Sequence, residues 1–407
     1  MTAIAAASLG TTMDQRPDST SARPRISAQA TIRVASRSEI THSLHWQTAF
    51  ARERKDHRYY ELVEDTLANE FDYGYLLIEE AGVTCAIQPY FVVDQDMLAG
   101  TGRIALQIVA AVRRLWPRFM YARTMMLGCA AGEGHLDASD ERSQRDIAEL
   151  LSRSLVNIAR QLNCALVVLK EFPAHYRASM DCLRHAGFAR VPSMPMTTLA
   201  IEHKTFDEYL SAKLSSGTRM TIRRKLRIAA RAQPPITMDV VTDVGAVVDE
   251  IYPLYEKVYE RSPLQFEKLS KEFLCELAAR MPDKVRYFVW RQDARIIAFA
   301  LCMVHDNGIW HEYVGFDYSV AFSLHLYYRV YHDIIEWAIA NDCKRFYSGS
   351  LNYDPKWHLR QSLYPVDLYV SHTSRPINAV LKRVLPLMEP TRSDPILPNF
   401  QNYSELW

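Results

Sequence analysis

Apolar residues recur at regular spacing along most of this chain, and the clearest pattern lies in its last third. An apolar, aromatic run over residues 308–317 predicts a strand. Apolar residues at three-and-four spacing over 323–342 predict a helix with one buried face, and Ser323 is a suitable N-cap. Short apolar runs at 344–347 and 368–370 predict two further strands on either side of a polar turn.

That turn carries two cations. Asp354 followed by Pro355 predicts a helix start, because the carboxylate accepts free N–H groups and proline loses no bond there. Lys356 and Arg360 are four residues apart, so we expect them to project from one face of this first turn. A solvated helix face or a salt bridge explains two such cations equally well on spacing alone.

The same order of elements occurs twice. A hairpin, a strand, a loop, a long helix, a strand, a short helix and a strand follow one another over residues 73–201, and again over 284–371. The long helix at 140–162 corresponds to that at 323–342, and a further helix is predicted at 102–115. The repeat predicts an α/β (α+β) fold of two tandem halves, each a mixed, mostly antiparallel sheet flanked by helices.

Composition suggests where the parts begin and end. Residues 1–30 are rich in Ala, Ser, Thr, Pro and Arg, which predicts a disordered, dispensable leader. We expect an N-terminal half at 31–203 and a C-terminal half at 204–390, with the helices of 205–280 in the second half. Residues 391–407 are expected to form a tail.

Bulk composition excludes several classes of protein. With 407 residues, 48% hydrophobic and 23% charged, the chain can bury a large core. A formal net charge of +1 gives no general attraction to DNA, and no run of about 18 apolar residues predicts a membrane span. Seven scattered cysteines without a Cys-x-x-Cys pair suggest reduced thiols in a cytoplasm, and no cluster has zinc spacing.

Two polar residues interrupt the aromatic strand at 308–317. His311 and Glu312 are adjacent, so they are expected on opposite faces, and only one can face a substrate cleft. Either side chain could remove a proton from an attacking amine. Structural pairing at a strand edge is the alternative, and it applies equally to the isolated His325 and His372.

A basic helix is predicted at residues 215–233. It has no acidic residue and six cations: Arg219, Arg223, Arg224, Lys225, Arg227 and Arg231. Such a helix could bind a phosphate-rich donor, for example coenzyme A or the acceptor arm of an aminoacyl-tRNA. A solvated helix remains the alternative, since its apolar stripe is narrow for a membrane contact. The small-residue loop at 128–135 could hold pyrophosphate, although three nearby acids oppose it.

These elements together resemble the Fem-like branch of the GNAT acyltransferase superfamily. The likeness is closest to the BioF2-like acetyltransferase domain and to peptidoglycan biosynthesis or recognition proteins. The residues that carry it are His325, Tyr327, Tyr328, Glu336, Ala338, Ile339, Lys356, Arg360, Pro365, Ser371 and His372.

The resemblance implies an N-acyltransferase in which an amine attacks an activated acyl donor directly. No tightly bound cofactor is implied, and acyl-CoA, such as acetyl-CoA, is the expected co-substrate. Acyl carrier protein or aminoacyl-tRNA are alternative donors, and the acceptor would be a small-molecule, lipid or cell-wall-precursor amine. Lys356 and Arg360 would stabilise negative charge, and Glu312 or His311 would relay the proton. The expected donor-binding residues are Arg219, Arg223, Arg224, Ser323, His325, Tyr328 and Ser348.

Two departures from the family pattern favour an alternative. Gln361 stands where the family usually has glycine, and the expected donor loop at 320–324 has no glycine. A catalytically silent GNAT fold that binds a ligand or a partner protein would tolerate both changes.

Overall fold

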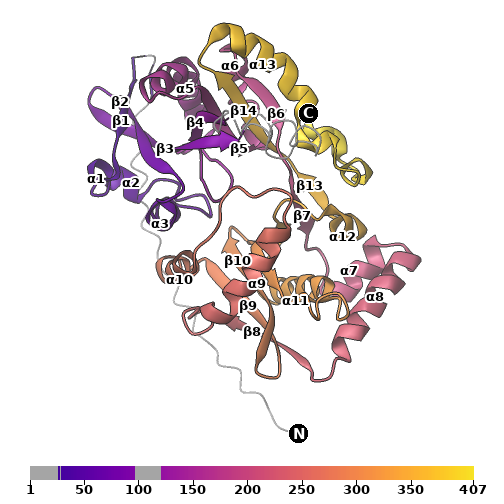
Figure 1. Ribbon diagram of the computed structural model, residues 1–407. Helices are drawn as coiled ribbons and strands as arrows, with labels where there is room; N and C mark the ends of the chain where they lie inside the picture. Colours follow the sequence, from indigo (N-terminus) through magenta and orange to yellow (C-terminus); the bar gives the residue numbers. More distant parts are fainter. Residues whose placement is uncertain (1–25, 28, 97–120) are drawn as a thin grey trace, which may run out of the picture.

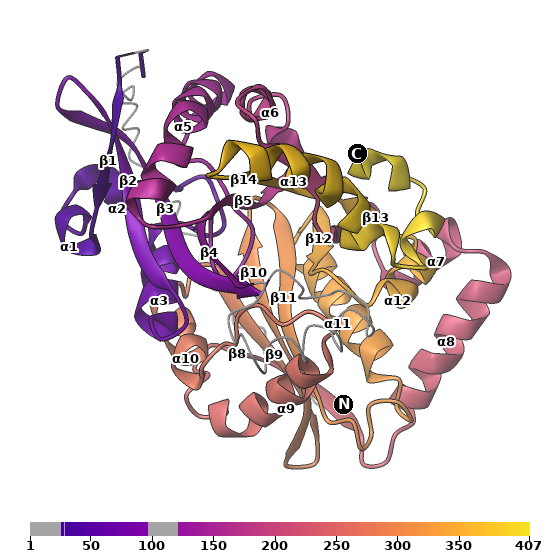
Figure 2. The same cartoon turned by 45° about the horizontal axis from the view of Figure 1, so that its top comes forward.

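Two seven-stranded sheets form the centre of the computed structural model, which describes residues 26–27, 29–96 and 121–407 (Figures 1 and 2). The first sheet has the strand order β1-β2-β3-β4-β5-β14-β6. Its strands are β1 (Thr31–Ala35), β2 (Asp72–Glu80), β3 (Val83–Asp96), β4 (Tyr121–Leu127), β5 (Leu166–Pro173), β14 (Val366–His372) and β6 (Ala189–Pro192). Only β4 and β5 pair in parallel.

The second sheet has the order β13-β7-β12-β11-β10-β9-β8. Its strands are β13 (Ser362–Tyr364), β7 (Met196–Ala200), β12 (Arg345–Ser348), β11 (Gly308–Phe316), β10 (Arg295–His305), β9 (Val285–Gln292) and β8 (Ile236–Val241). Only β11 and β12 pair in parallel. These mixed, mostly antiparallel sheets confirm the predicted fold class.

The two sheets exchange a strand. β14, late in the sequence, lies inside the first sheet, where Tyr369 pairs with Leu169 of β5 and with Arg190 of β6. β7, which comes before the second sheet's other strands, lies between β12 and β13, where Thr198 pairs with Tyr347. Each sheet therefore contains a strand from the other half of the chain, which the repeat in the sequence does not reveal.

Helices pack on both sheets and between them (Figures 1 and 2). They are α1 (Arg37–Ile40), α2 (Leu44–Gln47), α3 (His57–Leu67), α5 (Glu141–Gln161), α6 (Asp181–His185), α7 (Phe206–Lys213), α8 (Ser216–Ala230), α9 (Val248–Arg261), α10 (Lys271–Arg280), α11 (Leu326–Ala340), α12 (Tyr353–His358) and α13 (Arg375–Met388). α9 packs on β11, α8 packs on α11, and α13 lies over β14 and β6. None of the helices in these described ranges is both long and apolar enough to cross a membrane.

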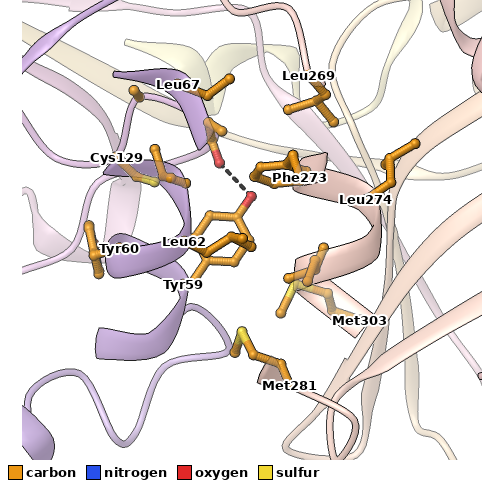
Figure 3. Packing of buried hydrophobic residues seen from close by; sticks show 14 of the residues in the cluster. Tyr59, Tyr60, Leu62, Leu67, Cys129, Leu269, Phe273, Leu274, Met281 and Met303 are labelled. Carbon is orange, nitrogen blue, oxygen red and sulfur yellow. Dashed lines mark hydrogen bonds between the residues drawn. The ribbon is translucent and has the colours of Figure 1, made fainter. Parts of the chain in front are cut away.

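A continuous apolar core joins the two halves where α3 meets α10 (Figure 3). Tyr59 of α3 contacts Phe273 of α10 edge to face, with ring centroids 6.0 Å apart. The Tyr59 hydroxyl also donates to the Ala131 carbonyl oxygen over 2.8 Å, so this buried polar group has a partner. Such a shared core makes the halves one packed unit.

The chain end packs onto the second half. Leu397, Phe400 and Leu406 are buried with Tyr353 and Leu363 in a separate small cluster. Three short 3₁₀ segments, Pro390–Arg392, Leu397–Asn399 and Tyr403–Leu406, form this region.

Several predicted boundaries need correction. α11 begins at Leu326 rather than near Ser323, because His325 is its N-cap in a left-handed conformation (φ 50°). The Ser323 hydroxyl instead donates to the Val320 carbonyl oxygen. The leader predicted at 1–30 lies outside the described residues apart from 26–27 and 29–30, as does the whole helix predicted at 102–115.

Candidate functional site

β11 and β12 separate in the middle of the second sheet. Their last parallel pair joins His311 to Ser348, and β11 then continues to Phe316 without β12 beside it. A β-bulge lies at the same point, since Cys302 of β10 faces His311 and the register then skips Glu312. Bulges are frequent beside active sites because they redirect side chains and end strand pairing. The bulge accounts for the opposite surroundings of His311 and Glu312.

A row of polar side chains crosses three strands at this point. Ser348 pairs with His311 on one side and with Thr197 of β7 on the other. The Thr197 and Ser348 hydroxyl oxygens are 2.8 Å apart, and the Thr197 hydroxyl donates to Gln361 Oε1 over 2.6 Å. A polar row inside an apolar core is costly, so its presence here suggests a function beyond packing.

His311 is buried in this row, with 7% of its surface exposed. Its ring contacts Tyr331 of α11 edge to face, at a centroid distance of 5.6 Å, and lies near Phe346. Burial, assisted by the nearby charge of Lys356, lowers the pKa of His311 to about 3. His311 is therefore neutral at physiological pH.

Lys356 is the second perturbed group. It is 3% exposed, and its ammonium group donates to the Gly349 carbonyl oxygen, in the segment that leaves β12. Burial lowers its pKa to about 7, because no acid compensates the charge. Lys356 can therefore gain or lose a proton near neutral pH.

Three buried polar atoms in this region have no hydrogen-bond partner among the described residues. They are His311 Nε2, Gln361 Nε2 and the Tyr327 hydroxyl. Tyr327 stacks on Tyr331, which contacts His311 in turn, so the three groups belong to one neighbourhood. Unpaired buried polar atoms are uncommon, and they are typical of sites that bind a polar ligand.

The structure does not place Arg360 beside Lys356, so their predicted common face is wrong. α12 begins at Tyr353 after a left-handed Asn352 and ends at His358, so Arg360 lies beyond the helix. Arg360 has a positive φ of 54° and is exposed, whereas Lys356 points into the protein. The predicted start at Asp354 and Pro355 is wrong for the same reason.

Glu312 lies on the other side of β11, in a buried charge cluster between the halves. Its Oε1 accepts from Arg54 Nε over 2.6 Å, and its Oε2 is 3.3 Å from Lys55 Nζ. Both cations also pair with Glu133, and the Arg54 guanidinium lies 3.9 Å above the Trp310 ring. The four charges balance, which is the arrangement that a low-dielectric interior requires. This geometry favours a structural role for Glu312.

The predicted basic helix is α8, and its cations have different surroundings. Arg223 forms a forked pair with Asp207 of α7, at 2.7 Å for both contacts, and Arg219 donates to the Ser211 carbonyl oxygen. Arg224 and Arg227 are exposed. The paired arginines attach α8 to α7, so only the exposed ones remain for an anionic ligand.

α8 also lies against the N-terminal end of α11. Lys225 Nζ lies 4.0 Å from the ring centroid of Tyr328. Burial lowers the pKa of His325, and the charges of Lys225 and Arg224 lower it further. The structure thus brings His325 and Tyr328 together with the basic helix, as the resemblance implies, while Ser323 lies in the exposed turn before them.

An open groove of about 320 Å³ runs between α7, α8 and α11. Its lining includes the cations Arg223, Arg227, Arg329 and His332. Arg329 and His332 both contact Asp333, so their charges are partly compensated.

The loop at 128–135 in the first half is filled by the protein itself. Lys55 occupies the space beside Gly132, and the Lys170 ammonium donates to the Gly132 carbonyl oxygen over 2.9 Å. Glu133 takes part in the buried charge cluster. The pyrophosphate cradle suggested for this loop is therefore wrong.

Sequence reasoning missed Thr197 and the Arg54–Lys55 pair. Thr197 reaches the site only through the exchange of β7, for which the sequence carries no local signal. The adjacent cations Arg54 and Lys55 had a signal, since such a pair beside apolar residues is unusual, but their acidic partners are distant in sequence. No three His, Cys, Asp or Glu residues in the described part of the chain could hold a metal ion.

Comparisons with known proteins agree with the resemblance seen in the sequence. FemX shares 8% identity at a TM-score of 0.49, with 80% of this chain and 93% of that chain covered. A tandem GNAT protein from the clavulanic acid biosynthesis pathway shares 9% at 0.44, covering 84% and 99%. The C-terminal domain of a putative lysylphosphatidylglycerol synthetase from Agrobacterium fabrum shares 15% at 0.43, covering 67% and 84%.

No curated protein matches the chain significantly. The sequence model of the FemAB-like family, described as peptidoglycan biosynthesis/recognition, matches residues 115–372, which is more than half of the chain. The protein therefore belongs to the FemAB-like family.

Proposed function

We propose that this protein is an acyltransferase that moves an acyl or aminoacyl group from an activated donor to an amine. The reaction would take place in the second half, where β11 and β12 separate. The observation that carries the proposal is the juxtaposition of Lys356 and His311, both buried and both with strongly lowered pKa values. Membership of the FemAB-like family supports the same reaction class.

Acyl transfer to an amine needs a group that changes protonation near neutral pH. The amine nitrogen attacks the donor carbonyl carbon, the carbon–sulfur or carbon–oxygen ester bond breaks, and the amine's proton ends on the leaving thiol or alcohol. Lys356, with a pKa of about 7, can take up the first proton and return it. In its protonated form it also stabilises a developing oxyanion.

His311 would act as a neutral hydrogen-bonding partner. Its unpaired Nε2 lies within the same polar row as Ser348. A pKa of about 3 makes it a weak base, so we assign proton transfer to Lys356 rather than to His311. We assign Glu312 to holding the halves together and Arg360 to the exposed rim.

The donor would bind along α8 and the beginning of α11. Arg224 and Arg227 are exposed there, and the N-terminal end of α11 adds its own partial positive charge. Phosphate-rich donors such as acyl-CoA or aminoacyl-tRNA match this charge. The acceptor would be an amine on a small molecule, a lipid or a cell-wall precursor.

A two-stage experiment tests the proposal. Thermal shifts with acetyl-CoA, long-chain acyl-CoA, acyl carrier protein and charged tRNA identify the donor, which at 100 times its Kd should stabilise by roughly 2.7 kcal/mol. Single-turnover assays with that donor then compare wild type, Lys356→Met and Lys344→Met, since Lys344 is an exposed lysine of the same half.

We expect Lys356→Met to lose roughly a hundredfold or more in rate, and Lys344→Met to behave as wild type. Donor binding without product in the wild type would instead identify a silent GNAT fold. Normal turnover of Lys356→Met would overturn the assignment of the site.

A further inference from the structure

α13 exposes an apolar stripe on the far side from its packing face. It packs on the first sheet through Leu381 and Leu385, and through Asn378, whose amide donates to the Gly187 carbonyl oxygen over 2.9 Å. None of its residues is buried. Its exposed apolar residues are Ile377, Val380, Val384, Leu387 and Met388. They recur at three-and-four spacing, so they form one face roughly 100° wide.

This stripe is unusual for the molecule. Five of the fifteen exposed large hydrophobic residues in the described part of the chain lie on this one helix. Figure 2 shows α13 lying along the outside of the first sheet, with no other element covering its outer side. A contiguous exposed apolar face on a helix typically marks a contact with another molecule or with a membrane.

The charges on α13 indicate the kind of surface it contacts. Arg375, Lys382 and Arg383 are exposed, and the helix contains no acidic residue. The nearest acid in sequence, Glu389, is buried and accepts from Thr391 and Trp407. Asp367 on the underlying β14 is paired with arginines. The free charge around the stripe is therefore positive.

We propose that α13 docks the protein on the surface of an anionic lipid bilayer. The helix, about 21 Å long, would lie in the plane of the interface, with the stripe among the headgroups and upper acyl chains. Its cations would attract anionic lipids. A symmetric dimer through the same stripe is disfavoured, because it would bring Arg383 and its counterpart together as like charges. The proposal does not depend on the proposed acyl transfer.

Vesicle sedimentation of the full chain tests this docking. Vesicles of phosphatidylcholine alone are compared with vesicles containing roughly one-third phosphatidylglycerol, at low and at physiological salt. The stripe variant is Val380→Gln with Leu387→Gln, at positions that are 61% and 78% exposed. The matched control is Val83→Gln with Leu44→Gln, at positions that are 53% and 80% exposed and lie elsewhere on the surface. Because all four side chains are exposed, both variants should keep the wild-type Tm.

We expect wild type and control to bind the anionic vesicles, and the stripe variant to lose about tenfold or more in affinity. Lys382→Gln with Arg383→Gln should weaken binding to anionic vesicles by roughly tenfold to thirtyfold and flatten the salt dependence. Absence of vesicle binding by the wild type, or equal binding by the stripe variant, would overturn the proposal. A wild-type dimer that the stripe variant converts to monomer, without vesicle binding, would assign the stripe to a second copy instead.

Discussion

The hydroxyl groups of Thr197 and Ser348 lie 2.8 Å apart, although 151 positions of the chain separate them. Thr197 comes from β7, which precedes all other strands of the second sheet, and Ser348 ends β12 beside His311. The candidate site is therefore built from both halves of the chain. A change to either half can alter it without touching a reacting group.

Lys356→Met should change the pH dependence of stability. The pKa of Lys356 falls from 10.5 to about 7 on folding, so between these values the unfolded chain binds more protons than the folded one. Wild-type stability should rise by up to about 1.4 kcal/mol per pH unit in this window from this group alone, and the variant should lack that rise. Urea unfolding of both proteins at about pH 7 and pH 9 measures the difference. An unchanged difference between the two pH values would show that Lys356 is not buried in its charged form.

His311→Leu should act at the acidic end. The pKa of His311 falls from 6.5 to about 3 on folding, so below about pH 6.5 the unfolded chain takes up a proton that the folded chain does not. Wild-type stability from this group should fall as the pH decreases through that window, and the variant should be less sensitive to acid. Unfolding at about pH 6.5 and pH 4.5 measures this, with the exposed His185→Leu as control. Equal acid sensitivity of wild type and His311→Leu would contradict the buried, neutral imidazole.

Glu312→Gln should unfold the protein more easily. The change leaves Arg54 and Lys55 with one carboxylate in a buried cluster, and breaking such a pair typically costs about 3–5 kcal/mol. The exposed pair of Glu141 and Arg145 supplies the control, because Glu141→Gln should leave Tm unchanged.

The same variant separates two roles for Glu312. A structural role predicts a lower Tm but normal single-turnover rate for the folded fraction. A rate loss of a hundredfold with wild-type Tm would instead identify Glu312 as the proton relay.

Arg224→Gln with Arg227→Gln should weaken donor binding. Both side chains are exposed on α8, whereas Arg223 is held by Asp207 and is a poor test of binding. We expect a loss of roughly tenfold and a shallower dependence of Kd on salt, because two phosphate contacts are removed. Calorimetric titration at several salt concentrations measures this. Arg145→Gln with Arg153→Gln, two exposed arginines of α5, is the matched control, and equal loss in both variants would exclude a specific patch.

The sequence predicted the elements whose signals are local. The helix expected at 323–342 is observed at Leu326–Ala340, and the strand expected at 308–317 at Gly308–Phe316, because apolar spacing reports burial directly. The start of α12 was misplaced because tertiary hydrogen bonds determine it. The Tyr353 hydroxyl donates to the Pro195 carbonyl oxygen over 2.8 Å, and this contact positions the turn before the helix.

The candidate site was only half predictable. Residue type and family likeness pointed to His311 and Lys356, but their burial depends on α11 and β7 packing over them. The cations of α8 were apparent, whereas the pairing of Arg223 with Asp207 depends on how α7 and α8 meet. No local pattern encodes such contacts.

The exchange of strands also sets a schedule for the newborn chain. β5 and β6 leave the ribosome early, but the strand that fills the gap between them begins only at Val366, long after β6 ends at Pro192. At about 5–20 residues per second, the vacant slot persists for on the order of 10–30 s of synthesis. During that interval two bare strand edges face each other in the first sheet, and such edges recruit other chains. Production of this protein should consequently depend on chaperones that shield nascent β-edges, and neither half expressed alone should yield a well-behaved product.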